Sequence, residues 1–136
     1  MGLFGNLFSS SKKKEIVEEI NLIKAAQAHI GWKMRLQKYL DGTSGEKLDS
    51  EVVCRDDQCK LGTWIHGSAR NHFSGEEAFH CLIADHALFH QHAGEIVRHV
   101  QLNQHDKAHA LMEGEYKHVS HKVVMALTEL NNELAA

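Results

Sequence analysis

The chain has 136 residues and a mass of 15.3 kDa, which suits one compact domain and excludes a multidomain enzyme. Hydrophobic residues make up 43% of it and charged residues 24%, so wholesale disorder is excluded. Fifteen Lys and Arg against eighteen Asp and Glu give a net charge of −3, without the basic excess that nucleic-acid binding requires. Twelve histidines, many of them in the second half, are the unusual feature.

The N-terminal segment is apolar but short, and a lysine run at 12–14 follows it. A secretory signal has its charges first and a longer apolar core, so we expect none here. Asn6 stands where N-myristoylation requires Ser or Thr. No run approaches the ~20 apolar residues that cross a bilayer, which argues against stable membrane insertion. We therefore expect a flexible tail over residues 1–12, available to a partner, and a single domain over residues 13–136.

Helical periodicity dominates the rest of the chain, starting with a helix predicted over 13–40. Its apolar positions recur every three or four residues at Ile16, Ile20, Ile23, Ala26, Ile30 and Met34. A glycine-containing stretch at 41–45 ends it. Two short helices are predicted next, one capped by Asp49 or Ser50 and ending at Val53, the other over 58–66.

Two further long helices are predicted in the second half. Ser74 resembles a helix cap with Glu77 completing a capping box, and this helix runs to about residue 103. One of its faces carries Phe79, Ile83, His86, His90, Ala93 and Val97. The last helix covers about 106–134, with an apolar face of Ala110, Met112, Tyr116, Val119, Val123, Ala126, Leu127 and Leu130. Packing such faces together predicts an all-α, antiparallel four-helix bundle with a short additional helix that carries Cys59.

Four residues in this bundle form a candidate metal site. His86 and His90 are four residues apart and share the apolar face of their helix, so both imidazoles should point inward. Burying two unpartnered imidazoles is costly, and a metal ion removes that cost. His29 lies on the inward stripe of the first helix, and packing of Leu61, Trp64 and Ile65 should hold Cys59 against the bundle. One thiolate and three imidazoles favour Zn²⁺ over any hard cation.

The same residues resemble the bacterial chemoreceptor zinc-binding domain family. The resemblance rests on three blocks in order, over roughly residues 20–130: His29-Ile30-Gly31-Trp32, Cys59-Lys60-Leu61-Gly62-Thr63-Trp64, and His86-Ala87-Leu88-Phe89-His90. It implies zinc ligation by His29, Cys59, His86 and His90. It also implies an antiparallel four-helix bundle, a homodimer, and signalling in chemotaxis or through diguanylate cyclases. Because neither a signalling coiled coil nor a cyclase domain is evident, we expect the sensor part alone, with a separate signalling protein as partner.

The remaining cysteines and histidines receive simpler interpretations. Three cysteines at irregular spacing argue against a disulfide framework and favour a reducing cytoplasm. Cys54 and Cys81 are interpreted as small apolar fillers, with a resolving thiol at Cys54 as the lesser possibility. Most other histidines are expected at the surface, including the pair His105 and His109. For His118 and His121 the alternative is an inward position beside Val119.

The leading hypothesis is a zinc-binding sensory domain that responds to zinc or to oxidants such as hypochlorous acid through the Cys59–zinc unit. A second hypothesis is a hemerythrin-like di-iron bundle, suggested by His72 and Glu76, although the final His and Asp of such a site are missing and Cys59 has no place in it. A third is a zinc buffer holding several ions. An enzyme is not expected, because four protein ligands leave no open coordination position on zinc.

Overall fold

The computed structural model describes residues 12, 14–16 and 18–135 and is an all-helical bundle in that part. The expected tail over 1–12 lies outside the described residues except for Lys12, which is helical and exposed. The predicted all-α bundle is confirmed. None of the helices in the described part of the chain combines the length and the apolar character that a membrane span requires.

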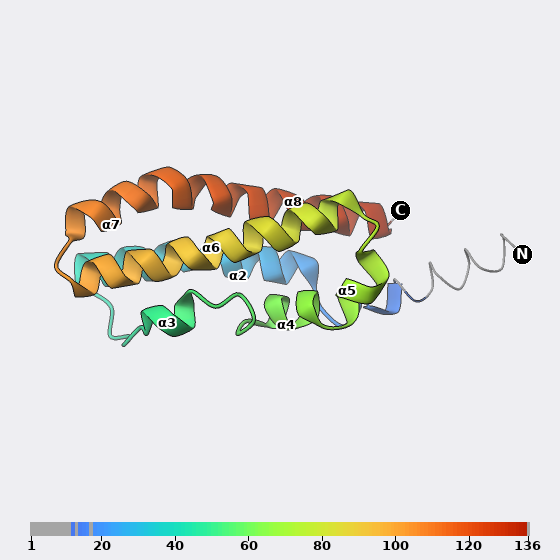
Figure 1. Ribbon diagram of the computed structural model, residues 1–136, viewed down its shortest axis with the longest axis horizontal. Coiled ribbons are helices and arrows are strands. Elements are labelled where there is room, and N and C mark those ends of the chain that lie inside the picture. Colours follow the sequence, from blue (N-terminus) through green and yellow to red (C-terminus); the bar gives the residue numbers. More distant parts are fainter. Residues whose placement is uncertain (1–11, 13, 17, 136) are drawn as a thin grey trace, which may run out of the picture.

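Three long helical segments and one row of short helices build the bundle. Helix α2 spans Leu22–Asp41, α6 spans Glu77–Gln101, and the last segment consists of α7 (His105–Leu111), η1 (Met112–Tyr116) and α8 (Lys117–Ala135). The short helices are α3 (Ser50–Val53), α4 (Lys60–His66) and α5 (Ser68–Phe73). Figure 1 shows these three one after another along one side, in the place of a fourth bundle member. Successive members run in opposite directions, as predicted.

The first helix begins later than the periodicity predicts. The helical path is interrupted at 19–21, and α2 begins at Leu22. The residue before it, Asn21, caps the helix, since its side-chain oxygen accepts a hydrogen bond from the Lys24 N–H at 3.0 Å. This local capping ends the preceding turn, because the Asn21 side chain satisfies a donor that a continuous helix would satisfy from its own backbone. The predicted unbroken helix over 13–40 was therefore wrong.

The inward face of α2 agrees only in part with the prediction. Ile23, Ile30 and Met34 are exposed by 43%, 54% and 65%. The buried residues of the helix are Leu22, Ala25, Ala26, His29, Leu36 and Leu40, so the inward positions predicted for Ala26 and His29 are confirmed. Both sets recur at helical spacing, so hydrophobic periodicity alone did not distinguish the buried stripe from a neighbouring exposed one.

The second half of the chain agrees more closely with expectation, with two corrections. Glu76, not Ser74, precedes the first residue of α6, and no side-chain cap bond forms there. Ser74 ends α5 instead, a helix the sequence did not predict, and its carbonyl accepts a hydrogen bond from the His80 ring. Ala110 is exposed, and Ala108 takes its place in the core. The helix after α7 deviates at Gly114 (φ −103°, ψ −106°) before continuing as α8.

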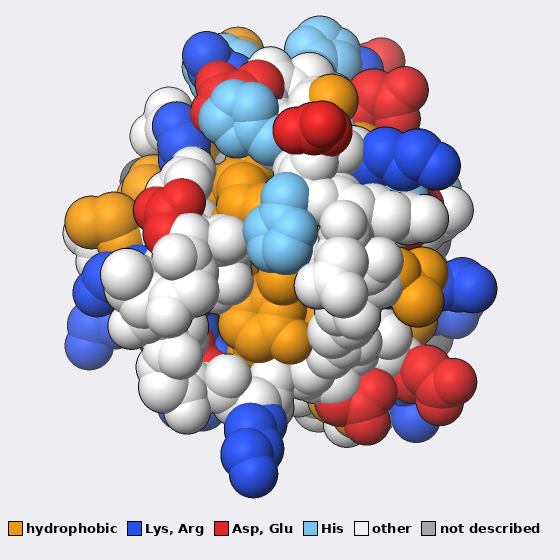
Figure 2. All heavy atoms as spheres, turned by 90° about the vertical axis from the view of Figure 1, so that its left-hand side faces the viewer, with side chains coloured by type: hydrophobic (Ala, Val, Ile, Leu, Met, Phe, Trp, Pro, Cys, Tyr) orange, Lys and Arg blue, Asp and Glu red, His pale blue; other side chains and the backbone are white. Residues whose placement is uncertain are grey.

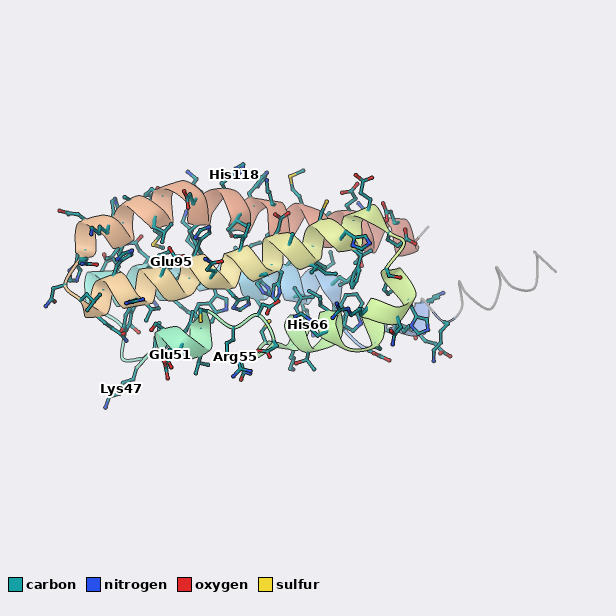
Figure 3. All side chains as sticks on the ribbon, viewed as in Figure 1. Lys47, Glu51, Arg55, His66, Glu95 and His118 are labelled. Carbon is teal, nitrogen blue, oxygen red and sulfur yellow. The ribbon has the colours of Figure 1, made fainter. Side chains whose placement is uncertain are left out.

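Histidines other than the three candidate ligands lie largely outside the core. His105, His109, His118 and His121 are all exposed, so the possibility that the last two face inward was wrong. Figure 2 looks onto the end of the bundle where α6 passes into α7 and shows histidine side chains among acidic and basic ones at the surface. Figure 3 shows His118 on the outer side of α8 and Lys47, Glu51 and Arg55 on the outer side of the α3 segment.

Candidate metal centre

The structure brings together the four residues that the sequence singled out. His29 comes from α2, Cys59 is the residue before α4, and His86 and His90 lie one turn apart on α6. Their candidate ligand atoms all lie within 4.8 Å of one another. Among the described residues, this is the one group of three or more His, Cys, Asp or Glu side chains with that property. Residues 57 positions apart along the chain therefore share one site.

Three contact distances between the donor atoms fit a tetrahedral ion. The Cys59 Sγ lies 3.4 Å from His86 Nε2 and 3.6 Å from His90 Nε2, and His86 Nε2 lies 3.2 Å from His29 Nε2. Tetrahedral zinc, with its usual bond lengths, places two nitrogens about 3.3 Å apart and a sulfur and a nitrogen about 3.6 Å apart. These three contacts thus match those of a His₃Cys zinc site.

Backbone carbonyls orient two of the imidazoles toward the centre. His29 Nδ1 donates a hydrogen bond to the Ala25 carbonyl at 2.7 Å, and His90 Nδ1 donates to the Val53 carbonyl at 3.0 Å. A neutral imidazole that donates from Nδ1 carries a bare lone pair on Nε2. Both Nε2 lone pairs therefore face the same small volume as the Cys59 sulfur. Such lone pairs repel one another unless a cation lies between them, so the donor set fits a bound Zn²⁺.

Burial keeps all three imidazoles neutral. His86 is 0% exposed, and burial lowers its pKa to about 2, with a further lowering by the neighbouring His90 and His29. Burial also lowers the pKa of His29 and of His90, although the hydrogen bonds to the Ala25 and Val53 carbonyls oppose this. Neutral imidazole is the form that binds a metal ion.

Cys59 occupies a more open position than the three imidazoles. It is half-buried, and burial raises the pKa of its thiol, while the hydrogen bond from the Gly62 N–H to its sulfur at 3.3 Å acts in the opposite direction. A bound zinc ion deprotonates a coordinating thiol. Cys59 is thus the one donor of the four that combines sulfur chemistry with access from solvent.

The local structure around Cys59 explains the Cys-x-Leu-Gly-x-Trp segment. Leu61 is 1% exposed and anchors α4 in the core. A Cβ at Gly62 would lie 1.6 Å from the Asp56 carbonyl oxygen, so the loop before Cys59 can fold over α4 only if this residue is glycine. The Trp64 indole N–H donates to the Ile16 carbonyl at 2.8 Å and ties α4 to the chain before α2.

Close packing of α3 on α6 places the Val53 carbonyl at His90. A Cβ at Gly94 would lie 2.6 Å from the Cys54 Cβ and 2.9 Å from the Ser50 carbonyl oxygen. The sequence suggested only that Gly94 weakens its helix, whereas the structure shows that it allows the two backbones to approach. A glycine one turn after His90, on the same helix face, was the available signal. Nothing in the sequence marked the Val53 or Ala25 carbonyls.

Other predicted residues remain outside the cluster. Cys54 and Cys81 are both exposed, so their interpretation as apolar fillers was wrong. His72 Nδ1 lies 3.1 Å from the Ser68 carbonyl and belongs to no metal-binding group in the described part. His66 pairs with Asp56 at 2.9 Å on the outside of the loop.

Fold and site together define a helical bundle whose interior holds a compact His₃Cys cluster suited to a metal ion. Residues 29–97, about half of the chain, match the chemoreceptor zinc-binding domain. The chain therefore belongs to the chemoreceptor zinc-binding domain family, as the sequence blocks suggested, and the match includes all four cluster residues. Neither the curated proteins nor the solved structures yielded a match.

Proposed function

We propose that this chain is a regulatory domain in which His29, Cys59, His86 and His90 hold one Zn²⁺ and in which the Cys59–zinc unit responds to zinc or to oxidants such as hypochlorous acid. The observation that carries the proposal is the convergence of three imidazole Nε2 atoms and one sulfur, at contact distances that suit a tetrahedral ion. Four protein donors leave no open position for a substrate, which supports a regulatory role over catalysis.

The three imidazoles would mainly hold the metal ion, and the Cys59 sulfur would respond to oxidants. His86 and His90 are fixed by a long buried helix, and His29 by its bond to Ala25, so these three imidazoles provide a stable base. Zinc, when bound, keeps the Cys59 sulfur as a thiolate. Oxidation of that sulfur to a sulfenate weakens it as a donor. Because the Gly62 N–H also bonds this sulfur, the change acts directly on the first turn of α4.

A homodimer that acts with a signalling partner in the cytoplasm completes the proposal, with output in chemotaxis or cyclic-di-GMP-type signalling. Support for the dimer comes from Ile23, Ile30 and Met34, three exposed apolar side chains on α2. Exposed apolar groups in a row favour an interface. We expect Ile30→Glu to convert a dimer into a folded monomer in sedimentation velocity, with Lys33→Glu as the matched control. A wild-type protein that sediments as a monomer at all concentrations would contradict the dimer.

Metal analysis tests the site directly. Native protein is expected to contain one equivalent of zinc, and Cys59→Ser and His90→Ala are each expected to lose it while retaining helical circular dichroism. Several tightly held zinc ions per chain would favour the buffering alternative. A coloured protein that contains iron would favour the hemerythrin-like alternative.

The oxidant response is tested on the same variants. Hypochlorous acid should release zinc from the wild-type protein, and Cys59→Ser, reloaded with zinc at high concentration, should show no such response. Cys81→Ser serves as a control, because Cys81 is exposed and belongs to no metal-binding group among the described residues. Zinc loss from Cys59→Ser at the wild-type rate would refute the mechanism.

A further inference from the structure

A cavity of about 910 Å³ opens between the first half of α2 and helix α4 and reaches the cluster. His29 and Cys59 form part of its wall, whereas His86 and His90 do not line it. The cavity therefore approaches the cluster from one side, the side of the sulfur. Its lining further includes Trp64 as an apolar surface and Glu19, Lys24 and Lys60 as charged groups.

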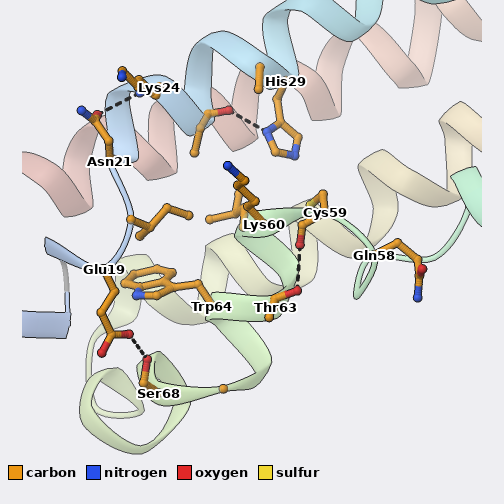
Figure 4. Close-up of a pocket in the computed structure, with 15 residues that line it drawn as sticks. Glu19, Asn21, Lys24, His29, Gln58, Cys59, Lys60, Thr63, Trp64 and Ser68 are labelled. Carbon is orange, nitrogen blue, oxygen red and sulfur yellow. Dashed lines mark hydrogen bonds between the residues drawn. The ribbon is translucent and has the colours of Figure 1, made fainter.

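The charges around this cavity are predominantly positive. Lys24 comes from the first turn of α2, and Lys60 is the first residue of α4. Figure 4 shows the Lys60 side chain pointing from α4 into the gap toward α2. No ion pair of Lys24 or Lys60 occurs among the described residues. Glu19 is the single acidic residue of the wall and accepts a hydrogen bond from the Ser68 hydroxyl at 2.5 Å.

We propose that this cavity binds an anionic low-molecular-weight thiol of the glutathione type and presents it to Cys59. The volume lies within the ~300–1,000 Å³ typical of small-molecule sites. The two lysines of the wall match the two carboxylates of such a ligand. The Glu19 carboxylate matches the ammonium group of such a ligand. Trp64 supplies an apolar wall.

The chemical consequence rests on the proposed oxidation of Cys59, whereas binding itself does not. Hypochlorous acid transfers its hydroxyl group to the Cys59 thiolate, which becomes a sulfenic acid, and the chlorine of the oxidant is released as chloride. The thiol of the bound ligand then attacks the sulfenic sulfur, so that a mixed disulfide forms and water leaves. A second thiolate of the same kind attacks the ligand sulfur, which yields the ligand disulfide and restores the Cys59 thiolate. The cavity thus provides the route by which the response is reversed.

The first experiment measures binding without any redox step. S-methylglutathione, which has no reactive thiol, is titrated into the zinc-loaded full chain by calorimetry. We expect saturable binding to the wild-type protein and at least ~10-fold weaker binding to Lys24→Glu/Lys60→Glu, because two attractions become repulsions. Lys47→Glu/Lys107→Glu carries the same charge change on exposed sites outside the cavity wall and should bind like the wild type. Absence of binding, or equal binding by both double variants, overturns the inference.

The second experiment separates this inference from the proposed function. After one equivalent of hypochlorous acid, trapping with dimedone counts the Cys59 sulfenate, and intact mass then follows the glutathione adduct. We expect equal sulfenate yields in both double variants but a slower adduct in Lys24→Glu/Lys60→Glu, while the neutral 2-mercaptoethanol reacts equally with both. If no sulfenate forms, the proposed oxidant response is contradicted. The calorimetric titration then still tests whether the cavity binds the anionic ligand. Equal rates of glutathione adduct formation in the two double variants contradict the ligand-binding role of the cavity and leave the proposed function untouched.

Discussion

The two sides of the cluster are built by different means. On one side, His86 and His90 lie on a 25-residue helix whose apolar face is buried along its length, so their relative position follows from helix geometry. On the other side, Cys59 precedes a seven-residue helix, reached through a loop after the four-residue α3. That side depends on close backbone approaches and on single hydrogen bonds. We infer that the α6 side of the cluster is rigid, whereas the side of α3, the loop and α4 can move. The second is called the adjustable side below.

Removal of the metal should produce the largest difference in amide hydrogen exchange between the two sides of the cluster. Treatment of the zinc-loaded protein with a chelator is expected to accelerate amide hydrogen exchange in residues 54–66 by ~10–100-fold, because the metal ties Cys59 to the long helices and a short helix opens readily once such a tie is lost. Residues 82–97 of α6 should change little, since the core around Phe89, Ile96 and Val97 remains. Mass spectrometry of peptides after exchange measures both regions. Equal acceleration in the two would show that the metal organises the entire bundle.

Gly62→Ala should damage the adjustable side alone. The added methyl group would overlap the Asp56 carbonyl oxygen, so the loop must move and displace the Cys59 sulfur. We expect zinc affinity to fall by ~10–100-fold, the range typical of lost support around metal ligands. Competition with a chelator of known affinity measures this change.

Gly31→Ala is the matched control for that substitution. No atom lies within 4 Å of a Cβ at Gly31, and the residue is exposed within α2. Alanine there should raise the free energy of unfolding by roughly 0.5–1 kcal/mol through helix propensity and leave zinc affinity unchanged. An equal loss of affinity in both variants would contradict the role assigned to Gly62.

Gly94→Ala should have a smaller effect, because it acts at the contact between the two sides. The methyl group would press on the Cys54 Cβ and the Ser50 carbonyl and push α3 away from α6. The hydrogen bond from His90 Nδ1 to the Val53 carbonyl would then lengthen or break. We expect a loss of zinc affinity of up to ~10-fold, partly masked in thermal melts by the better helix propensity of alanine. Unchanged affinity together with an unchanged His90 Nδ1–H proton signal would show that this carbonyl does not position the ring.

The sequence alone determined the fold class and the members of the cluster. Helical periodicity marked His86 and His90 as neighbours on an inward face, because four residues make about one helical turn, and the blocks around His29 and Cys59 completed the set. Periodicity did not distinguish the exposed stripe of Ile23, Ile30 and Met34 from the buried stripe of Leu22, Ala25 and Leu36, since both repeat at helical spacing. The partners of a helix decide which of its stripes is buried.

Only the tertiary structure determined which backbone groups orient the metal donors and where a cavity gives access to Cys59. The carbonyls of Ala25 and Val53 exist at every position of any chain, so no sequence signal identifies the two that orient imidazoles. The local capping by Asn21 redirects the chain before α2, and the cavity beside Cys59 lies between that turn and α4. Such features depend on backbone groups that approach across the bundle, and their positions become defined only when distant segments pack together.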